Sequence, residues 1–282
     1  MKRWLKISAL GLALLAFTGC SSANKRVEDS LGVTPTTQAD DASNSENSNQ
    51  EGNNVDDNQV GSNQPTPEPQ GDYAENVIIA LDAGHGGIFT GATYDGRVEK
   101  ELTLSMAFYV KEYLEENYTG FEVHLVREDD SILSEDVKED LELRAQFAKD
   151  VNADALVSLH FNASENHTQQ GSMVLVSHRE NVTESSKGLG TSILNELLAL
   201  GLESSGNITR NSNDMFDELG NPLDYYAINR HSAARDIPGI IVEHCFMDNA
   251  TDVQFLDSEA DLRALAKADA VGIANYFGFA GK

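Results

Sequence analysis

Short apolar runs alternate with helical segments from residue 76 almost to the end of the chain. The apolar runs have the character of strands and lie at 76–82, 121–127, 153–164, 171–177 and 239–246. The segments with helical spacing lie at 100–117, 140–152, 184–202 and 257–277. This alternation predicts a single α/β domain whose mostly parallel sheet has helices on both faces. In such sheets, ligand sites lie beyond the carboxyl ends of the strands.

The N-terminus has the pattern of a secretory signal. The basic start "MKRWLK" is followed by "ISALGLALLAF", an apolar stretch that is short for a membrane span. The "TGC" after it resembles a bacterial lipobox, where the signal is cut before a cysteine that is then lipidated. We therefore expect a signal peptide at 1–19 and a lipid on Cys20 that holds the protein at a membrane. Phe17 stands where leucine is most usual, so ordinary cleavage nearby and an uncleaved anchor remain alternatives.

Residues 20–75 lack the composition of a folded domain. From residue 27 this segment has no Lys or Arg and is rich in Ser, Asn, Gln, Asp and Pro. Such a segment cannot bury enough apolar surface to offset the entropy of ordering. We expect a disordered acidic linker that joins Cys20 to a folded domain at 76–282.

The charge and the cysteines narrow the class of protein further. The chain of 282 residues carries a net charge of −26 at pH 7, whereas binding a phosphate backbone needs a basic face. Nucleic acid is therefore not an expected partner. With a lipid on Cys20, the second cysteine, Cys245, has no partner for an intramolecular disulfide, so the core must stabilise the domain.

Four ionisable residues fall near one rim of the predicted sheet. His85 follows the first strand, His160 ends the third, and Glu243 ends a late strand. Glu99 stands just before the first long helix. Two histidines and a glutamate form a known catalytic zinc set with an open position for water, so His85, Glu99 and His160 would bind one Zn²⁺. Glu243 would remain as the general base. Taken singly, each histidine is more often structural and Glu99 resembles a helix-start carboxylate, so only their convergence indicates a site.

Residues 76–280 resemble the zinc-dependent N-acetylmuramoyl-L-alanine amidases of the amidase-3 family. The resemblance lies in "IALDAGHGG", "VEKELTL", "LVREDD", "LELRAQFAKDVNADALVSLHFNAS" and "IPGIIVEHCFMDN", in the family's order and spacing. It implies that His85, Glu99 and His160 bind zinc and that Glu243 is the catalytic glutamate. It also implies a mixed six-stranded sheet with flanking helices, a phosphorylase/hydrolase-like fold.

The resemblance also implies a reaction and a location. The family hydrolyses the amide bond between the lactyl group of N-acetylmuramic acid and the first L-alanine of the stem peptide in bacterial peptidoglycan. Together with the lipobox, this implies an extracytoplasmic cell-membrane lipoprotein that faces the cell wall. Asn162 and Asn249 stand beside the expected site and are candidates for substrate contacts, and Arg210 and Arg230 are candidates for a stem-peptide carboxylate.

The chain departs from the family after the catalytic glutamate. His244 and Cys245 stand where the family usually has a small or hydroxylated residue and then glycine. Because neighbours on a strand point to opposite faces, we expect His244 to face away from the zinc and Cys245 to point the same way as Glu243. Cys245 could bind metal as a thiolate, but we expect a buried, inert thiol. The segment 207–236 is too short for the inhibitory helix that plugs the site in some members. Asp82 either accepts a hydrogen bond from a ligand histidine or simply forms a turn.

Two other functions remain open at this point. A wall-binding or regulatory protein on a degenerate amidase scaffold would bind no zinc. A zinc peptidase or a sugar deacetylase would bind zinc but release other products. The sequence also leaves open the physiological process, the preferred stem peptide and the need for an unidentified activator.

Overall fold

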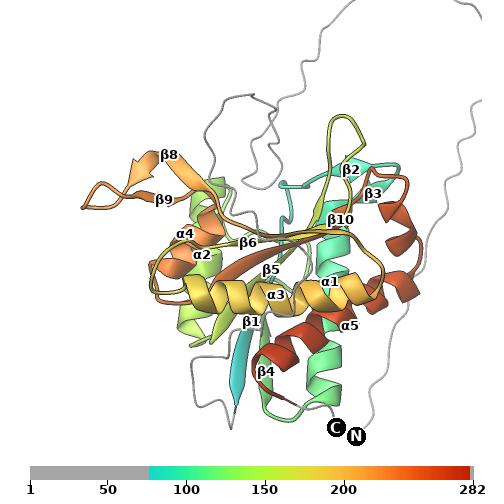
Figure 1. Ribbon diagram of the computed structural model, residues 1–282, viewed down its shortest axis with the longest axis horizontal. Coiled ribbons are helices and arrows are strands. Elements are labelled where there is room, and N and C mark those ends of the chain that lie inside the picture. Colours follow the sequence, from blue (N-terminus) through green and yellow to red (C-terminus); the bar gives the residue numbers. More distant parts are fainter. Residues whose placement is uncertain (1–75, 280–282) are drawn as a thin grey trace, which may run out of the picture. The chain divides into compact units, whose positions relative to one another are not determined.

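The computed structural model of the chain describes residues 76–279 (Figure 1). The expected signal peptide at 1–19, the lipidated Cys20 and the linker at 20–75 lie outside the described residues.

Within residues 76–279, six strands form the main sheet, in the order β4-β1-β5-β10-β6-β7. The strands are β1 (Val77–Ala83), β4 (Phe121–Leu125), β5 (Ala155–Asn162), β6 (Ser172–Val176), β7 (Ser204–Ile208) and β10 (Gly239–Phe246). Strand β6 runs antiparallel to β10, and the other neighbouring pairs are parallel. The expected mixed, mostly parallel sheet is thus confirmed.

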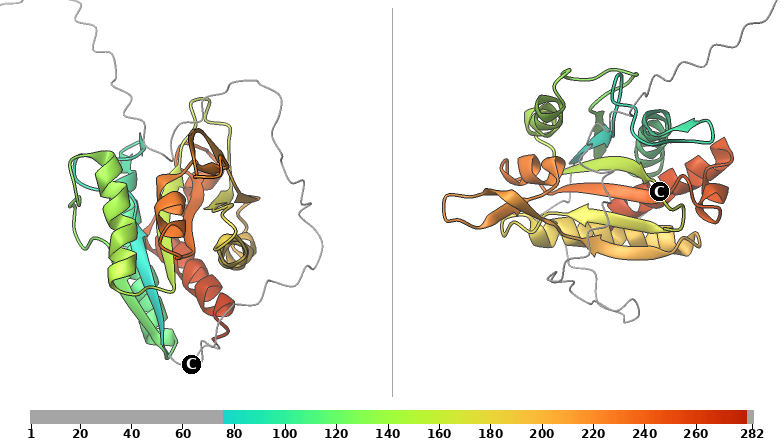
Figure 2. Two further views of the ribbon diagram at one scale, coloured as in Figure 1. Left: turned by 90° about the vertical axis from the view of Figure 1, so that its left-hand side faces the viewer. Right: turned by 90° about the horizontal axis from the view of Figure 1, so that it is seen from above.

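Helices cover both faces of this sheet (Figure 2). One face packs against α1 (Glu99–Asn117), α3 (Thr183–Ala199) and α5 (Glu259–Tyr276). The other face packs against α2 (Val137–Asp150) and α4 (Ala227–Ala233). Each face therefore has its own apolar core, as the continuous apolar runs of the central strands require.

Two helix starts follow directly from the sequence. The Asp136 carboxylate accepts hydrogen bonds from the backbone N–H groups of Lys138 and Glu139 at the first turn of α2. The Ser258 hydroxyl accepts from the N–H of Asp261 at the start of α5. Short polar side chains at this position satisfy amides that have no partner within the helix, so they fix where each helix begins.

Several short elements complete the fold. They are β2 (Thr93–Tyr94), β3 (Arg97–Val98), β8 (Asn211–Phe216), β9 (Pro222–Asp224) and the 3₁₀ helix η1 (Asp252–Phe255). Strands β2 and β3 form one hairpin, and β8 and β9 form another that projects beside α4 (Figure 1). The segment 207–236, expected to be too short for a plugging helix, forms the end of β7, the β8–β9 hairpin and α4.

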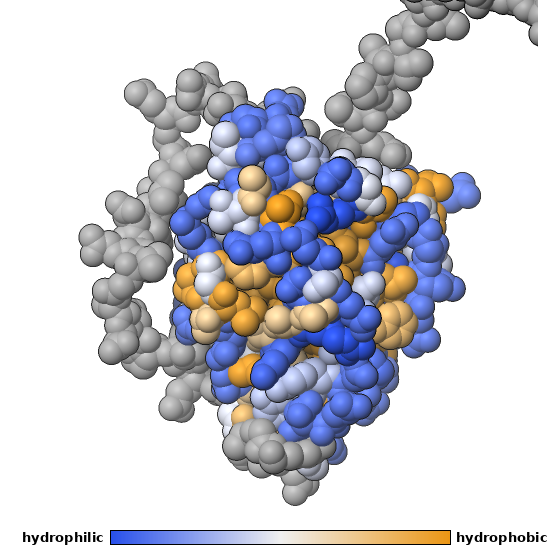
Figure 3. Space-filling model, turned by 90° about the vertical axis from the view of Figure 1, so that its right-hand side faces the viewer, coloured by the Kyte–Doolittle hydropathy of each residue, from blue (hydrophilic) through white to orange (hydrophobic). Residues whose placement is uncertain are grey.

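The surface of the described residues carries both hydrophilic and hydrophobic side chains. On the face shown in Figure 3, hydrophobic residues lie in groups separated by hydrophilic ones. The exposed large hydrophobic residues are Ile88, Tyr94, Phe108, Leu133, Leu198, Leu200, Phe216 and Leu219. Among the helices of residues 76–279, none has the length and apolar character needed to cross a bilayer.

The central strands β1, β5 and β10 are parallel neighbours, so their carboxyl ends meet at one edge of the sheet. The chain reverses its winding here, because β1 leads through α1 to β4 on one side, whereas α2 leads to β5 on the other. Crevices at such reversals are where α/β sheets place their ligands. The predicted site residues belong to this edge.

Candidate metal centre

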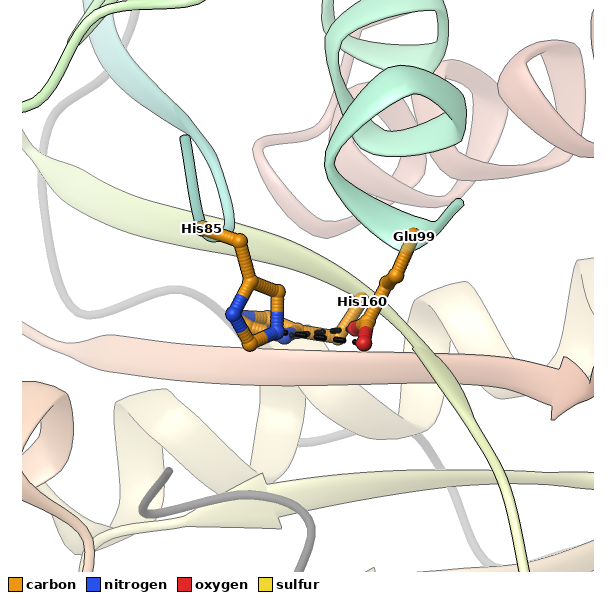
Figure 4. Close-up of side chains that lie close together, drawn as sticks. All are labelled: His85, Glu99 and His160. Atoms are coloured by element: carbon orange, nitrogen blue, oxygen red, sulfur yellow. Dashed lines mark hydrogen bonds and ion pairs between the residues drawn. The ribbon is translucent and has the colours of Figure 1, made fainter. Parts of the chain in front are cut away.

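Three buried side chains meet at this edge of the sheet (Figure 4). His85 lies in the loop after β1, Glu99 is the first residue of α1, and His160 lies in β5. His85 Nε2 is 3.1 Å from Glu99 Oε2, and His160 Nδ1 is 3.0 Å from Glu99 Oε1. The three potential ligand atoms lie within 4.8 Å of one another. The structure thus brings together the three residues that the sequence predicts as metal ligands.

The donor set and its surroundings fit a metal ion. Two imidazole nitrogens and a carboxylate suit zinc and other first-row metals. Burial raises the pKa of Glu99, but the charges of His85 and His160 and their hydrogen bonds hold it well below its usual value. Burial lowers the pKa of His160, which favours the neutral ring that a metal ligand must present.

Backbone amides from two other segments hold Glu99 in place. Its Oε2 accepts a hydrogen bond of 2.8 Å from the N–H of Ala92, and its Oε1 accepts one of 3.0 Å from the N–H of Phe161. The carboxylate is therefore oriented by the loop before β2 and by β5, independently of the two histidines.

Glycines make room for the ligands. A Cβ on Gly84 would lie 2.3 Å from the His160 ring, and a Cβ on Gly91 would lie 2.5 Å from Glu99 Oε2. Gly91 also has φ +64°, which L side chains rarely adopt. His85 itself has φ +64°, an uncommon conformation for a residue with a side chain. The glycine-rich loop thus allows close approach of backbone and ligands.

A buried arginine supports the same loop from α2. The Arg144 guanidinium donates to Asp82 Oδ1 at 2.7 Å and to Asp140 Oδ2 at 2.6 Å. It also donates to the backbone carbonyl of His85 at 2.8 Å. Burial raises the pKa of Asp82, but the Arg144 charge and the hydrogen bond from Ser158 outweigh burial, so the net pKa is lowered. Asp82 is therefore an ionised partner of Arg144. It is connected to the ligand His160 through Ser158, which lies between the two side chains.

Glu243 lies beside the three ligands, on β10. It is the register partner of His160 in the parallel β5–β10 pair, so the two side chains lie on the same face. Its Oε2 is buried and has no hydrogen-bond partner among residues 76–279. Burial, and then the charge of Glu99, raises the pKa of Glu243 well above its usual value. A buried carboxyl group with a perturbed pKa at such a place is a candidate for proton transfer.

The four predicted substrate contacts belong to different parts of the fold: Asn162 ends β5, Arg210 lies between β7 and β8, Arg230 lies in α4, and Asn249 follows β10. The Asn162 side chain accepts from the next backbone N–H, and the Asn249 side chain accepts from two N–H groups at the start of η1. The Arg210 guanidinium lies 3.7 Å from the centre of the Tyr225 ring. Arg230 donates to the Tyr225 carbonyl at 2.9 Å and lines a cavity of about 560 Å³. Their part in binding substrate stays a prediction.

A smaller cavity of about 40 Å³ adjoins the two histidines. Its lining includes His85 and His160 and the apolar side chains of Leu141, Ile228 and Ile241. A cavity of this volume has room for a few water-sized groups. The site therefore has space for a small chemical group next to the imidazole rings.

The unusual residues after Glu243 lie where the register of β10 with β5 shifts, between Glu243 and Phe246. The His244 Nδ1–H donates to the carbonyl of His160 at 2.8 Å, and His244 Nε2 is 2.7 Å from Asp269 Oδ2 of α5. Its ring thus faces α5, on the other side of the strand from the expected ligands. Cys245 is a fully buried thiol, and burial raises its pKa well above the usual value, as expected for an inert cysteine.

Comparison with known families decides the classification. The sequence profile of the N-acetylmuramoyl-L-alanine amidases, amidase-3, matches residues 79–275, which is more than half of the chain. The chain belongs to this family. The members are hydrolases, so it is an enzyme of that class. The matched segment contains the three expected ligands and Glu243.

Individual members of the family are similar to this chain over 71–75% of its length. It is 27% identical over 207 residues to N-acetylmuramoyl-L-alanine amidase CwlM of Bacillus licheniformis, covering 71% of this chain and 69% of CwlM. It is 29% identical over 238 residues to AmiC of Neisseria meningitidis serogroup B, covering 75% of this chain and 55% of AmiC. The chain therefore spans only about half the length of AmiC.

A solved structure matches the fold as well. The CwlD amidase of Clostridioides difficile, in complex with the GerS lipoprotein, superposes with a TM-score of 0.56 at 26% sequence identity. The match covers 71% of this chain and 98% of that chain. The described domain of the amidase is thus equivalent to nearly the whole of that relative.

Three residues that support the site are not apparent from the sequence, namely Arg127, Arg144 and Ser158. Arg127 is buried and donates to the carbonyl of Gly84 at 3.1 Å. Ser158 could have been found, because it stands two residues before His160 on a strand and so shares its face. The two arginines gave no signal, because an arginine in a charged segment usually faces solvent.

Proposed function

We propose that this amidase hydrolyses, with zinc, the amide bond between N-acetylmuramic acid and L-alanine in bacterial peptidoglycan. One observation carries the proposal: His85, Glu99 and His160 meet beside Glu243 within the segment that matches the family. A buried two-histidine, one-glutamate set with a neighbouring free carboxyl group is the arrangement that catalytic zinc hydrolases use.

The residues divide the work in the following way. His85, Glu99 and His160 would hold the ion. A zinc ion there would polarise the attacking water and the amide carbonyl, and its charge would favour the ionised form of Glu243. Glu243 takes a proton from the water and delivers it to the alanine nitrogen as the amide bond breaks. Its buried Oε2 has no hydrogen-bond partner among residues 76–279 and is available for this proton.

Substrate contacts and location belong to the same proposal. Asn162 and Asn249 would contact the substrate at the rim, and Arg210 and Arg230 would attract carboxylates of the stem peptide. A lipid on Cys20 would hold the domain at 76–282 outside the cytoplasm, facing the wall, through the linker at 20–75 after removal of residues 1–19. CwlD was solved in complex with a lipoprotein, which supports a protein partner for this amidase. An activator among such partners stays a prediction.

Digestion of purified peptidoglycan tests the reaction. The wild-type protein should release stem peptides with a free N-terminal alanine from an intact glycan, as identified by mass spectrometry, and a zinc chelator should abolish the release. Glu243→Gln should lower the rate by about 10²–10⁴-fold, because the proton acceptor is lost while the metal ligands remain. Glu128→Gln is the matched control, because Glu128 is exposed and should leave the rate unchanged.

The products separate this proposal from its alternatives. Released acetate would indicate a deacetylase, and cleavage between amino acids would indicate a peptidase. A folded protein that binds peptidoglycan, binds no zinc and releases no product would indicate a degenerate scaffold. Each of these results would contradict the amidase proposal.

A further inference from the structure

Ser158 connects a metal-ligand histidine to a buried carboxylate. It stands two residues before His160 on β5, so both side chains lie on the same face of the strand. The Ser158 hydroxyl is 2.6 Å from Asp82 Oδ2 of β1, and His160 Nε2 is 3.2 Å from Ser158 Oγ. Ser158 is fully buried and Asp82 almost fully, so water does not compete for these contacts.

The direction of the hydrogen bonds follows from where the protons can be. Asp82 is ionised and faces the Arg144 guanidinium, so its oxygens only accept. The Ser158 hydroxyl has a single proton, which it donates to Asp82 across the short contact. Ser158 Oγ must then accept at its other contact, so His160 Nε2 carries a proton and donates it.

With a metal ion bound, this assignment leaves the lone pair of His160 Nδ1 for the ion, whereas without the ion the Glu99 carboxylate 3.0 Å away also attracts a proton to Nδ1. Nδ1 is the nitrogen that lies 3.0 Å from Glu99 Oε1, on the side where the three ligand atoms converge. A histidine binds a metal through the nitrogen that carries no proton, and the partner of the other nitrogen decides which one that is.

We propose that Ser158, supported by Asp82, is a positioning residue that fixes His160 as the Nε2–H tautomer and aims Nδ1 at the metal. The proposal rests on the proposed function only in that the three ligands bind a metal ion. It does not depend on which bond the enzyme cleaves.

The same ion-pair group reaches both ligand histidines. Arg144 holds Asp82 on one side and donates to the His85 backbone carbonyl on another, while Asp82 acts on His160 through Ser158. Partners of this kind behind a ligand typically contribute 10–100-fold in metal affinity. Ser158 is the link that can be removed with least disturbance, because Ser158→Ala deletes one oxygen and leaves the Arg144–Asp82 pair intact.

Metal binding by the full-length protein tests the proposal. Zinc affinity is measured by competition with a chromophoric chelator, and the absorption spectrum of the cobalt(II)-loaded protein reports the ligand geometry. Ser158→Ala should weaken zinc binding by about 10–100-fold and change the cobalt spectrum, while circular dichroism of the metal-free protein stays unchanged. Ser192→Ala is the matched control, because Ser192 is also buried but donates to the Gly272 carbonyl between α3 and α5. It should change neither readout.

The tautomer has its own measurement. In zinc-loaded protein with nitrogen-15-labelled histidine, NMR should find the wild-type His160 ring bound through Nδ1 and protonated at Nε2, and Ser158→Ala should change the Nε2 signal. A wild-type ring protonated at Nδ1, an unchanged zinc affinity in Ser158→Ala, or a wild type that binds no metal would each overturn the proposal. Weakened zinc binding in a protein that releases no alanine-terminated peptides would support the positioning role and contradict the amidase function instead.

Discussion

The buried pair of His244 and Asp269 gives a prediction about stability and pH. Both side chains are fully buried, and both ring nitrogens of His244 face acceptors, the His160 carbonyl and the Asp269 carboxylate. Burial lowers the pKa of His244, but the Asp269 charge and the two hydrogen bonds outweigh burial, so the net pKa is raised. The folded protein therefore keeps the protonated form of His244, beside the Asp269 carboxylate, up to a higher pH than the unfolded chain does.

The size of the effect follows from this burial. Asp269→Asn leaves the imidazolium without an opposite charge, and removing one member of a buried pair costs about 3–5 kcal/mol. That is a large part of a domain's typical stability of about 5–15 kcal/mol. We therefore expect the free energy of unfolding of Asp269→Asn to fall by that amount near neutral pH.

The pH dependence has a definite sign. Because the folded pKa of His244 lies above the unfolded value of about 6.5, the contribution of the pair is complete below that pH. It declines as pH rises toward the folded pKa, by at most about 1.4 kcal/mol per pH unit. The free energy of unfolding of the wild type should decline with pH in this way. That of His244→Phe should not, because phenylalanine has no titratable proton.

Urea unfolding from about pH 6 to about pH 8 measures both effects. The informative quantity is the difference between wild type and His244→Phe at each pH, since the other titrating groups are common to both. His124→Gln is the control, because His124 is partly exposed on β4 and its loss should leave the profile of the wild type. Parallel curves for wild type and His244→Phe, or an Asp269→Asn variant within about 1 kcal/mol of wild type, would refute a buried charge pair.

Three further predictions concern the metal centre and its support. Gly91→Ala should raise the dissociation constant for zinc at least about tenfold in a competition titration, because its Cβ would lie 2.5 Å from Glu99 Oε2; unchanged affinity would contradict this reading. Chelation should lower the free energy of unfolding by about 4 kcal/mol, relative to protein with free zinc at about 1,000 times its dissociation constant. Calorimetry with and without chelator checks this, and equal melting temperatures would speak against bound zinc. Arg144→Met should cost about 3–5 kcal/mol in urea unfolding, because Asp82 and Asp140 lose their opposite charge; a near-neutral effect would show that the pair is dispensable.

The main strands and helices could be predicted because each carries a strong periodic or continuous apolar signal. Strand β7, "SSGNI", could not, because an edge strand beside β6 needs few apolar side chains. The β2–β3 hairpin has two-residue strands, too short for any period to show.

The candidate site was predictable in part. The positions of His85 and His160 at strand ends, and the topology of parallel neighbours, place both at one edge of the sheet. Their approach to Glu99 depends on Gly84 and Gly91, whose missing side chains leave no periodic signal. The support from Arg144 depends on a tertiary ion pair that no local pattern in α2 reveals.

The anchoring of Glu99 has a consequence for how this centre can vary. Its two oxygens each serve a backbone amide, at Ala92 and at Phe161, and each also faces a histidine. An aspartate here, shorter by one methylene, would have to abandon either the amides or the histidines. The length of this side chain is thus tied to the fold itself. The centre should accordingly tolerate an exchange of one first-row metal for another more readily than an exchange of glutamate for aspartate.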